Sequence, residues 1–318
     1  MISDNIKNFT ITEYSFDKEP IHFISASTNE VFMFFKNKVP YIVRYSKRPA
    51  EWIAQITAEM KWLYYLANNG ISVSLPLYTI NGELVTSIND EGENCIISAY
   101  EMASGTFWDV NNPDKWNDTI FYNWGKTMAE MHVITKPYEA EIRREDFKHS
   151  WGDNVRACPS VYRIGEEILA EINAMPRDID SYGLIHNDLH LWNFYINDDV
   201  INVFDFDDSI YGWYALDIGI ALYHGLWWGR KGGEFTESII KNFMKGYLTV
   251  NQLSDYNLSK IPLFMKFRQI CKFSWFYDPN NVDEHQLERI RNIENDMLFN
   301  DVSLDAVFSS ISIVKMNL

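Results

Sequence analysis

The chain has 318 residues, of which 47% are hydrophobic, and it carries a formal net charge of −16 at pH 7. Proteins that bind nucleic acids or anionic membranes need a basic surface, so this charge argues against both kinds of partner. A cationic or amine-bearing substrate would be attracted to so acidic a protein, although high net charge more often serves solubility. The length favours two lobes, and the apolar content suffices for a sizeable core.

The three cysteines, Cys95, Cys158 and Cys271, are widely separated and show no paired spacing. Free, buried thiols in a reducing compartment are the simplest interpretation. No apolar run reaches the length of a membrane span, and the opening residues MISDN do not resemble a signal peptide. We therefore expect a cytoplasmic protein without a membrane partner, and we leave its oligomeric state open.

The first third of the chain shows mostly the patterns of β-strands. Residues 1–20 predict a short helix or strand that leads into a sheet. Strands are then predicted at residues 21–24, 30–35, 40–45 and 95–102. Between them, residues 53–68 repeat apolar side chains at helical spacing. This part of the sequence predicts a small sheet accompanied by a helix.

The remainder of the chain has mostly helical patterns. Helices are predicted at residues 117–133, 162–174, 218–224, 235–250, 262–277 and 284–299, and a loop rich in aromatic residues and glycine at 227–233. Residues 194–196 and 200–204 are an exception, because they predict a β-hairpin around an Asn-Asp-Asp turn.

Polar side chains are expected to gather at the open end of this hairpin. Asp188 and Asn193 fall on the loop that enters it, and Asp205 and Asp207 on the loop that leaves it. Because both loops open at one end, the three carboxylates would repel one another unless a cation lay between them. Oxygen ligands of this kind suit Mg²⁺. The hairpin therefore predicts a magnesium site, with His186 on the loop that enters it.

Each of these residues alone has an ordinary interpretation, because Asp and Asn are common in turns and a histidine before a turn more often makes a structural hydrogen bond. The combination is much rarer. A histidine, an aspartate two positions later and an asparagine seven positions later, followed by an apolar strand that ends in aspartate, is expected by chance at about one in 10⁵ starting positions.

The residues of this segment also resemble a known family. The run HNDLHLWN at 186–193 resembles the H-x-D-L-x-x-x-N catalytic loop of protein kinases, and DFD at 205–207 stands where those enzymes have D-F-G. The loop lacks the arginine, and the third position is aspartate rather than glycine. With DIG at 217–219, these departures make the sequence similar to the aminoglycoside phosphotransferase and choline kinase-like family of small-molecule kinases.

The resemblance implies an α+β, bilobal protein kinase-like fold. A small N-terminal antiparallel sheet lobe, residues 1–102, would bind the nucleotide, and a larger, mostly helical lobe, residues 103–318, would carry catalysis and substrate binding. The implied activity is transfer of the γ-phosphoryl group of ATP to a hydroxyl of an amino alcohol, an aminoglycoside or a sugar-like molecule.

The resemblance also assigns roles to the polar residues of the hairpin. Asp188 would be the catalytic base, and Asn193 and Asp205 would hold Mg²⁺. Asp207 would assist Asp205 or hold the loop. Support for the loop is expected from a further set of residues, His186, His190 and Asp217.

On the nucleotide side, Arg44 occupies the strand position where protein kinases have a phosphate-binding lysine, and Glu59 of the following helix is its expected partner. Ser27 and Asn29 lie in a loop that would cover the phosphates, but the loop contains no glycine and is equally typical of a plain hairpin. A final pair, Glu101 and Met102, is expected at the hinge beside adenine. The alternative for Arg44 and Glu59 is a solvated surface location.

Two further interpretations follow from the second part of the chain. Arg268, Lys272 and Trp275 share helical spacing and form either a solvated basic face or part of the substrate side. His132 is expected to be structural.

For the whole protein, a non-catalytic kinase-like nucleotide-binding protein and a protein-directed Ser/Thr kinase are the alternatives. The presence of Asp188, Asn193 and Asp205 argues against the first alternative, and only the glycine-free loop keeps it open. The second alternative lacks an A-P-E signature after Asp205.

Overall fold

The computed structural model describes residues 2–149, 151–229 and 235–316 and divides into two compact units. The first, here called the sheet unit, comprises Met1–Gly105, Pro137–Glu145 and Asn202–Asp207. The second, here called the helical unit, comprises Thr106–Lys136, Asp146–Ile201 and Asp208–Leu318.

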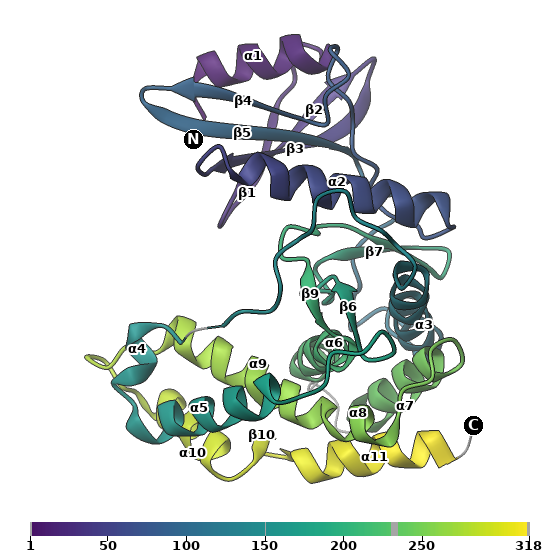
Figure 1. Ribbon diagram of the computed structural model, residues 1–318, viewed down its shortest axis with the longest axis vertical. Coiled ribbons are helices and arrows are strands. Elements are labelled where there is room, and N and C mark those ends of the chain that lie inside the picture. Colours follow the sequence, from purple (N-terminus) through teal and green to yellow (C-terminus); the bar gives the residue numbers. More distant parts are fainter. Residues whose placement is uncertain (1, 150, 230–234, 317–318) are drawn as a thin grey trace. The chain divides into compact units, whose positions relative to one another are not determined.

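The sheet unit contains a five-stranded antiparallel sheet in the order β1-β2-β3-β5-β4 (Figure 1). Its elements in chain order are α1 (Asp4–Tyr14), β1 (His22–Ala26), β2 (Glu30–Lys36), β3 (Val39–Lys47), α2 (Trp52–Asn68), β4 (Val85–Asp90) and β5 (Glu93–Glu101). The four strands and the helix predicted for this part are confirmed, and residues 4–14 of the start are helical.

The two helices of the sheet unit cover opposite faces of its sheet. Along β3, Tyr45 points toward α1, where its hydroxyl donates to Thr10 Oγ1 at 2.9 Å, whereas Arg44 points toward Glu59 of α2. Successive side chains of a strand face opposite sides of the sheet. Tyr45 therefore packs under α1, while its neighbour Arg44 is buried on the other face, where Glu59 of α2 pairs with it.

The helical unit is built mainly from nine helices within the residues that the structure describes. They are α3 (Asp118–Thr135), α4 (Asp153–Arg156), α5 (Pro159–Asn173), α6 (Tyr214–Gly229), α7 (Phe235–Leu248), α8 (Asp255–Ser259), α9 (Ile261–Phe276), α10 (Glu284–Glu294) and α11 (Leu304–Met316). Short strands pair as β6 (Tyr182–Ile185) with β9 (Ile210–Trp213), β7 (Phe194–Asn197) with β8 (Val200–Val203), and β10 (Met297–Phe299) with β11 (Val302–Ser303). The last two residues of β8 are counted with the sheet unit.

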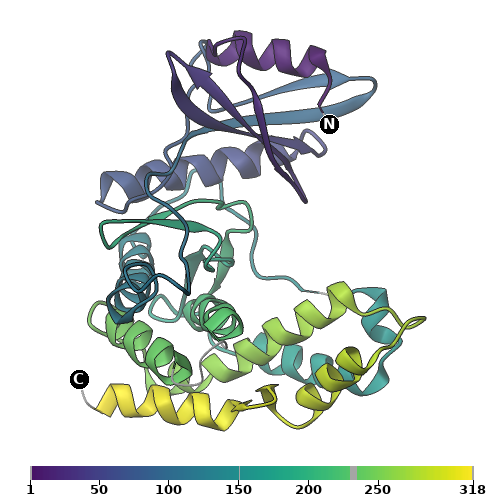
Figure 2. The same cartoon turned by 180° about the vertical axis from the view of Figure 1, so that it is seen from behind.

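Helices α3 and α7 approach each other backbone to backbone, as both ribbon views suggest (Figure 2). A Cβ atom built on Gly125 of α3 would lie 2.0 Å from the carbonyl oxygen of Phe243, and one on Gly246 of α7 would lie 2.0 Å from that of Tyr122. Glycine is therefore required on both sides of this contact, because any side chain would force the helices apart.

Several boundaries differ from the prediction. The helix predicted at 284–299 ends at Glu294, because the chain turns and residues 297–299 pair with β11. The predicted hairpin is present as β7 and β8. Of the loop predicted at 227–233, residues 227–229 are the end of α6, and the rest lies outside the described residues. None of the helices in the described ranges combines the length and the apolar character needed to cross a membrane.

Candidate active site

A buried aspartate fixes the start of the loop at residues 186–193. Asp217 of α6 is fully buried, and its two carboxylate oxygens accept the backbone N–H groups of His186 at 3.1 Å and Asn187 at 2.8 Å. His132 of α3 lies against the same carboxylate at 3.1 Å and meets the hydroxyl of Tyr247 at 2.8 Å through its other ring nitrogen. The loop is thus tied to the core of the helical unit, and His132 is structural, as predicted.

This arrangement predicts a large loss of stability when the carboxylate is removed. In Asp217→Ala the buried N–H of His186 and the partly buried N–H of Asn187 lose their acceptor, and an unsatisfied buried group costs about 1–3 kcal/mol. We expect the free energy of unfolding in urea to fall by about 3 kcal/mol or more. Asp180→Ala, which removes an exposed carboxylate paired with Lys136, is the control and should cost no more than about 1 kcal/mol. Equal losses in the two variants would contradict the role given to Asp217.

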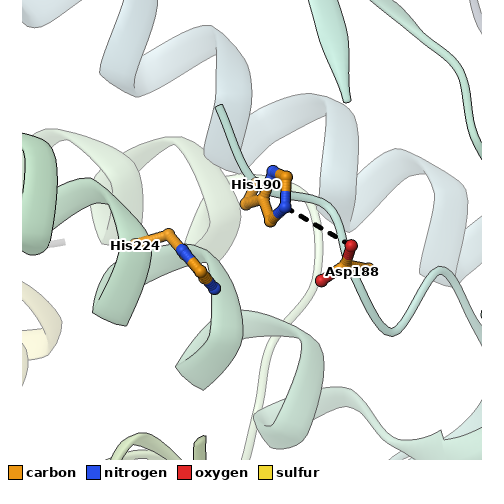
Figure 3. A group of neighbouring side chains, drawn as sticks. All are labelled: Asp188, His190 and His224. Atoms are coloured by element: carbon orange, nitrogen blue, oxygen red, sulfur yellow. Dashed lines mark ion pairs between the residues drawn. The ribbon is translucent and has the colours of Figure 1, made fainter. Parts of the chain in front are cut away.

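Asp188 lies on this loop with both carboxylate oxygens engaged. Asn193 Nδ2 donates to Asp188 Oδ2 at 3.0 Å and to the Asp188 carbonyl at 2.9 Å, so the two ends of the loop are joined. His190 Nε2 lies 3.4 Å from the same Oδ2 (Figure 3). The other oxygen, Oδ1, is paired with the guanidinium of Arg268 on α9.

Arg268 joins Asp188 to a second acceptor, His224 of α6. Its Nε donates to His224 Nε2 at 3.1 Å. Burial, together with the charge of Arg268, holds the pKa of His224 well below its usual value, so the ring is neutral and accepts this bond. Burial also lowers the pKa of His190. The sequence carries no signal for His224, whereas Arg268 was predicted as a solvated or substrate-side residue.

The ligand atoms of Asp188, His190 and His224 all lie within 4.8 Å of one another, which is a spacing that a metal ion could use (Figure 3). The guanidinium of Arg268 already bonds one oxygen of Asp188 and the accepting nitrogen of His224. A metal would have to displace this guanidinium, so we interpret the cluster as the binding place of the Arg268 side chain rather than of a metal ion.

In the sheet unit, the structure brings together the predicted pair Arg44 and Glu59. The two side chains form a two-pronged ion pair, with Nη1–Oε1 at 3.0 Å and Nη2–Oε2 at 2.8 Å, and both are buried. Tyr100 Oη also donates to Glu59. Burial would lower the pKa of Arg44, but Glu59, Tyr100 and Asp207 together outweigh this effect and raise the pKa well above its usual value. The solvated alternative is therefore wrong for this pair.

Asp207 is held by several cations of the same unit. Arg48 reaches both of its carboxylate oxygens at 2.7 and 3.2 Å, Arg44 lies 3.7 Å away, and Asn29 donates at 3.0 Å. Burial would raise the pKa of Asp207, but the Arg44 and Arg48 charges hold it at about 2. Arg144 donates to the Asp207 carbonyl. These contacts favour the loop-holding role over metal binding; the sequence did not indicate Arg48 or Arg144.

The other predicted nucleotide and metal residues also lie in the sheet unit. Asp205 follows β8 by two residues and has a left-handed φ of 63°. The Ser27 N–H donates to the Asn29 carbonyl at 3.0 Å within the β1–β2 loop. Glu101 ends β5 with its N–H bonded to the Leu75 carbonyl, and the Met102 side chain is exposed. Their roles remain predictions.

Comparison with known proteins places the chain among phosphotransferases. Residues 22–256 match the model of the phosphotransferase enzyme family. An amicoumacin kinase of Bacillus subtilis is 32% identical over 302 residues, 89% of each chain, and a homoserine kinase of Agrobacterium fabrum is 25% identical over 311 residues, 91% of this chain and 92% of that protein. A solved amicoumacin kinase in complex with AMP-PNP and Ca²⁺ has a TM-score of 0.85 at 25% identity and covers 96% of this chain and 97% of its own.

Proposed function

The chain belongs to the phosphotransferase enzyme family and is a small-molecule kinase with a protein kinase-like fold, and we propose that it moves the γ-phosphoryl group of ATP to a hydroxyl of a small molecule. The observation that carries this proposal is the position of Asp188. Its carboxylate lies on a loop that Asp217 anchors and Asn193 closes, so it is held in one orientation. Phosphoryl transfer depends mainly on such positioning and on neutralising charge.

Asp188 would accept the proton of the acceptor hydroxyl. The oxygen of that hydroxyl forms the new bond to the γ-phosphorus, while the bond from the γ-phosphorus to the β–γ bridging oxygen breaks and its electrons leave with ADP. His186, His190 and Asp217 would support the loop. Asp188 has only to be aligned with the hydroxyl, because phosphoryl transfer depends mainly on positioning.

Asn193 and Asp205 would hold Mg²⁺. The donor set fits this ion, because Asn193 turns its Nδ2 toward Asp188 and so leaves its amide oxygen, the atom a metal binds, on the opposite side of the amide. Bound Mg²⁺ would neutralise phosphate charge. Asp207, which two arginines hold, would keep its loop in place and is ranked behind Asp205 as a ligand.

The sheet unit would bind the nucleotide. Its Arg44 stays charged in its pair with Glu59 and would reach the phosphates. The β1–β2 loop, which includes Ser27 and Asn29, would cover them, and the segment of Glu101 and Met102 would lie at adenine.

A cytoplasmic location is also proposed, because the three cysteines are free and buried, as is usual in a reducing compartment.

A direct assay tests this function. Purified full-length protein is incubated with Mg-ATP and a panel that includes amicoumacin, homoserine, amino alcohols, aminoglycosides, sugars and peptides. We expect ADP to form with some member, and mass spectrometry to show a product heavier by one phosphoryl group. Chelating the metal should stop the reaction. Absence of both a phosphorylated product and a thermal shift with Mg-ATP would contradict the proposal.

A further inference from the structure

Two cationic side chains lie near Asp188 in the helical unit, and a third lies beside them. Arg268 and Lys272 lie one turn apart on α9, and Arg289 belongs to α10. Arg268 is paired with Asp188. The pKa of Lys272 is lowered, first by partial burial and then by the charges of Arg268 and Arg289, whereas the charge of Asp188 opposes this shift. Lys272 is therefore close enough to feel the charges of the other three groups, and positive charge is in excess around it.

This excess is not neutralised within the described residues. Lys272 makes no hydrogen bond or ion pair there; its ammonium lies over the rings of Trp275 at 5.2 Å and Phe276 at 5.4 Å. Arg289 likewise makes neither contact among those residues and lies 5.8 Å from the Phe273 ring. By contrast, Lys266 on the same helix is paired with Asp296. Unpaired cations at one place on a protein of charge −16 indicate a site for a negative ligand.

Arg268 can serve such a ligand because its present bonds are replaceable. One of its acceptors is the neutral ring of His224, and the other is one oxygen of Asp188. An incoming carboxylate can take two guanidinium N–H groups at once, which is a stronger arrangement than a bond to a neutral ring. Beside it, Trp275 is 54% exposed and offers an apolar surface next to the charged groups.

We propose that the acceptor carries a carboxylate near its reactive hydroxyl, and that Arg268 and Lys272 bind this carboxylate. The proposal rests on the proposed function and names the chemical class of its acceptor. When the carboxylate takes the guanidinium, Oδ1 of Asp188 is released to receive the hydroxyl proton, as the oxygen bonds to the γ-phosphorus and ADP leaves. An acceptor without the acid leaves Asp188 paired with Arg268. The net charge of the protein would attract a cationic substrate, whereas the local positive charge beside Asp188 favours one with a carboxylate.

Matched acceptors that differ only in this group test the proposal. The full-length protein is assayed with Mg-ATP on homoserine and homoserine amide, and on glycerate and glyceramide. For at least one pair, we expect kcat/KM to be about tenfold or more higher for the acid, because hydrogen bonds between charged groups are the stronger ones. A second readout is competition: the acids, more than their amides, should inhibit phosphorylation of any acceptor found in the panel.

Variants locate the preference. Arg268→Gln and Lys272→Gln should each lower the acid-to-amide ratio toward one, and Arg268→Lys, which keeps the charge, should retain part of it. Lys241→Gln, which removes an exposed charge on α7, should leave the ratio unchanged. Melting temperatures check that the variants fold; Lys272→Gln removes no ion pair and is the safer of the two glutamine variants.

The outcomes separate this proposal from the proposed function. A ratio near one or below in the wild type, or acids that neither react nor compete while a neutral or cationic acceptor is phosphorylated, would overturn it. So would an equal loss on acid and amide in both glutamine variants, because that pattern indicates a purely structural role. In each case ATP is still consumed, whereas failure of the proposed function means that no acceptor is phosphorylated and Mg-ATP does not bind.

Discussion

Asp188→Asn is expected to lower kcat by about 10²–10⁴-fold. Asparagine has nearly the shape of aspartate but cannot accept the hydroxyl proton, so the nucleotide and the acceptor still bind while the chemical step slows. Calorimetry should therefore show an ATP affinity within about threefold of the wild type, since Asp188 is not expected to touch the nucleotide. The rate is measured as ADP release with a proven acceptor.

Asp180→Asn is the matched control for this prediction. It makes the same chemical change at an exposed carboxylate of the helical unit, which is paired with Lys136. Surface pairs of this kind contribute little, so kcat and stability should stay near the wild-type values. A near-normal rate in Asp188→Asn would remove Asp188 from the mechanism.

Asp205→Asn is expected to abolish most of the Mg²⁺-dependent affinity for ATP, with a loss of at least about tenfold in the association constant. The substitution removes the carboxylate charge that would bind the metal ion. It leaves the backbone conformation unchanged, because Asp205 has a φ of 63° and asparagine tolerates this conformation better than alanine does. Titration calorimetry with ATP, with and without Mg²⁺, measures the effect.

The control is Asp198→Asn in the turn of the same hairpin. Asp198 is exposed and also has a positive φ, 46°, so the substitution makes the same change in charge and backbone preference. Mg-ATP affinity should not change in this variant. If Asp205→Asn bound Mg-ATP as tightly as Asp198→Asn does, the metal role of Asp205 would be wrong.

The parts of the molecule that follow from local patterns were predicted well. Runs of β-branched and aromatic residues identified β2 and β3, and the pair of Arg44 with Glu59, which was predicted from the family resemblance, is present in the structure. Helical spacing identified α3 and α9 to within a few residues. In these cases the type of element depends on which side chains face the core, and the order of apolar residues in the sequence shows this directly.

Contacts between distant segments could not be predicted in the same way. β6 and β9 are four residues long and pair Gly183 with Gly212, so neither segment has a strand pattern of its own. Similarly, Arg268 reaches Asp188 across 80 positions of sequence, and His224 joins them from a third segment. Only tertiary packing brings these groups together, and local spacing carries no trace of it.

The glycine contact between α3 and α7 divides the protein into regions of unequal tolerance to mutation. Where Gly125 and Gly246 lie against opposing carbonyl oxygens, even one methyl group is excluded, so variants there would be lost as misfolded protein whatever acceptor is offered. Trp275 and Phe276, by contrast, have more than half of their surface in solvent and can be exchanged at little cost to folding. A library designed to redirect this enzyme to new alcohols should therefore leave the helix seam untouched and randomise the aromatic end of α9.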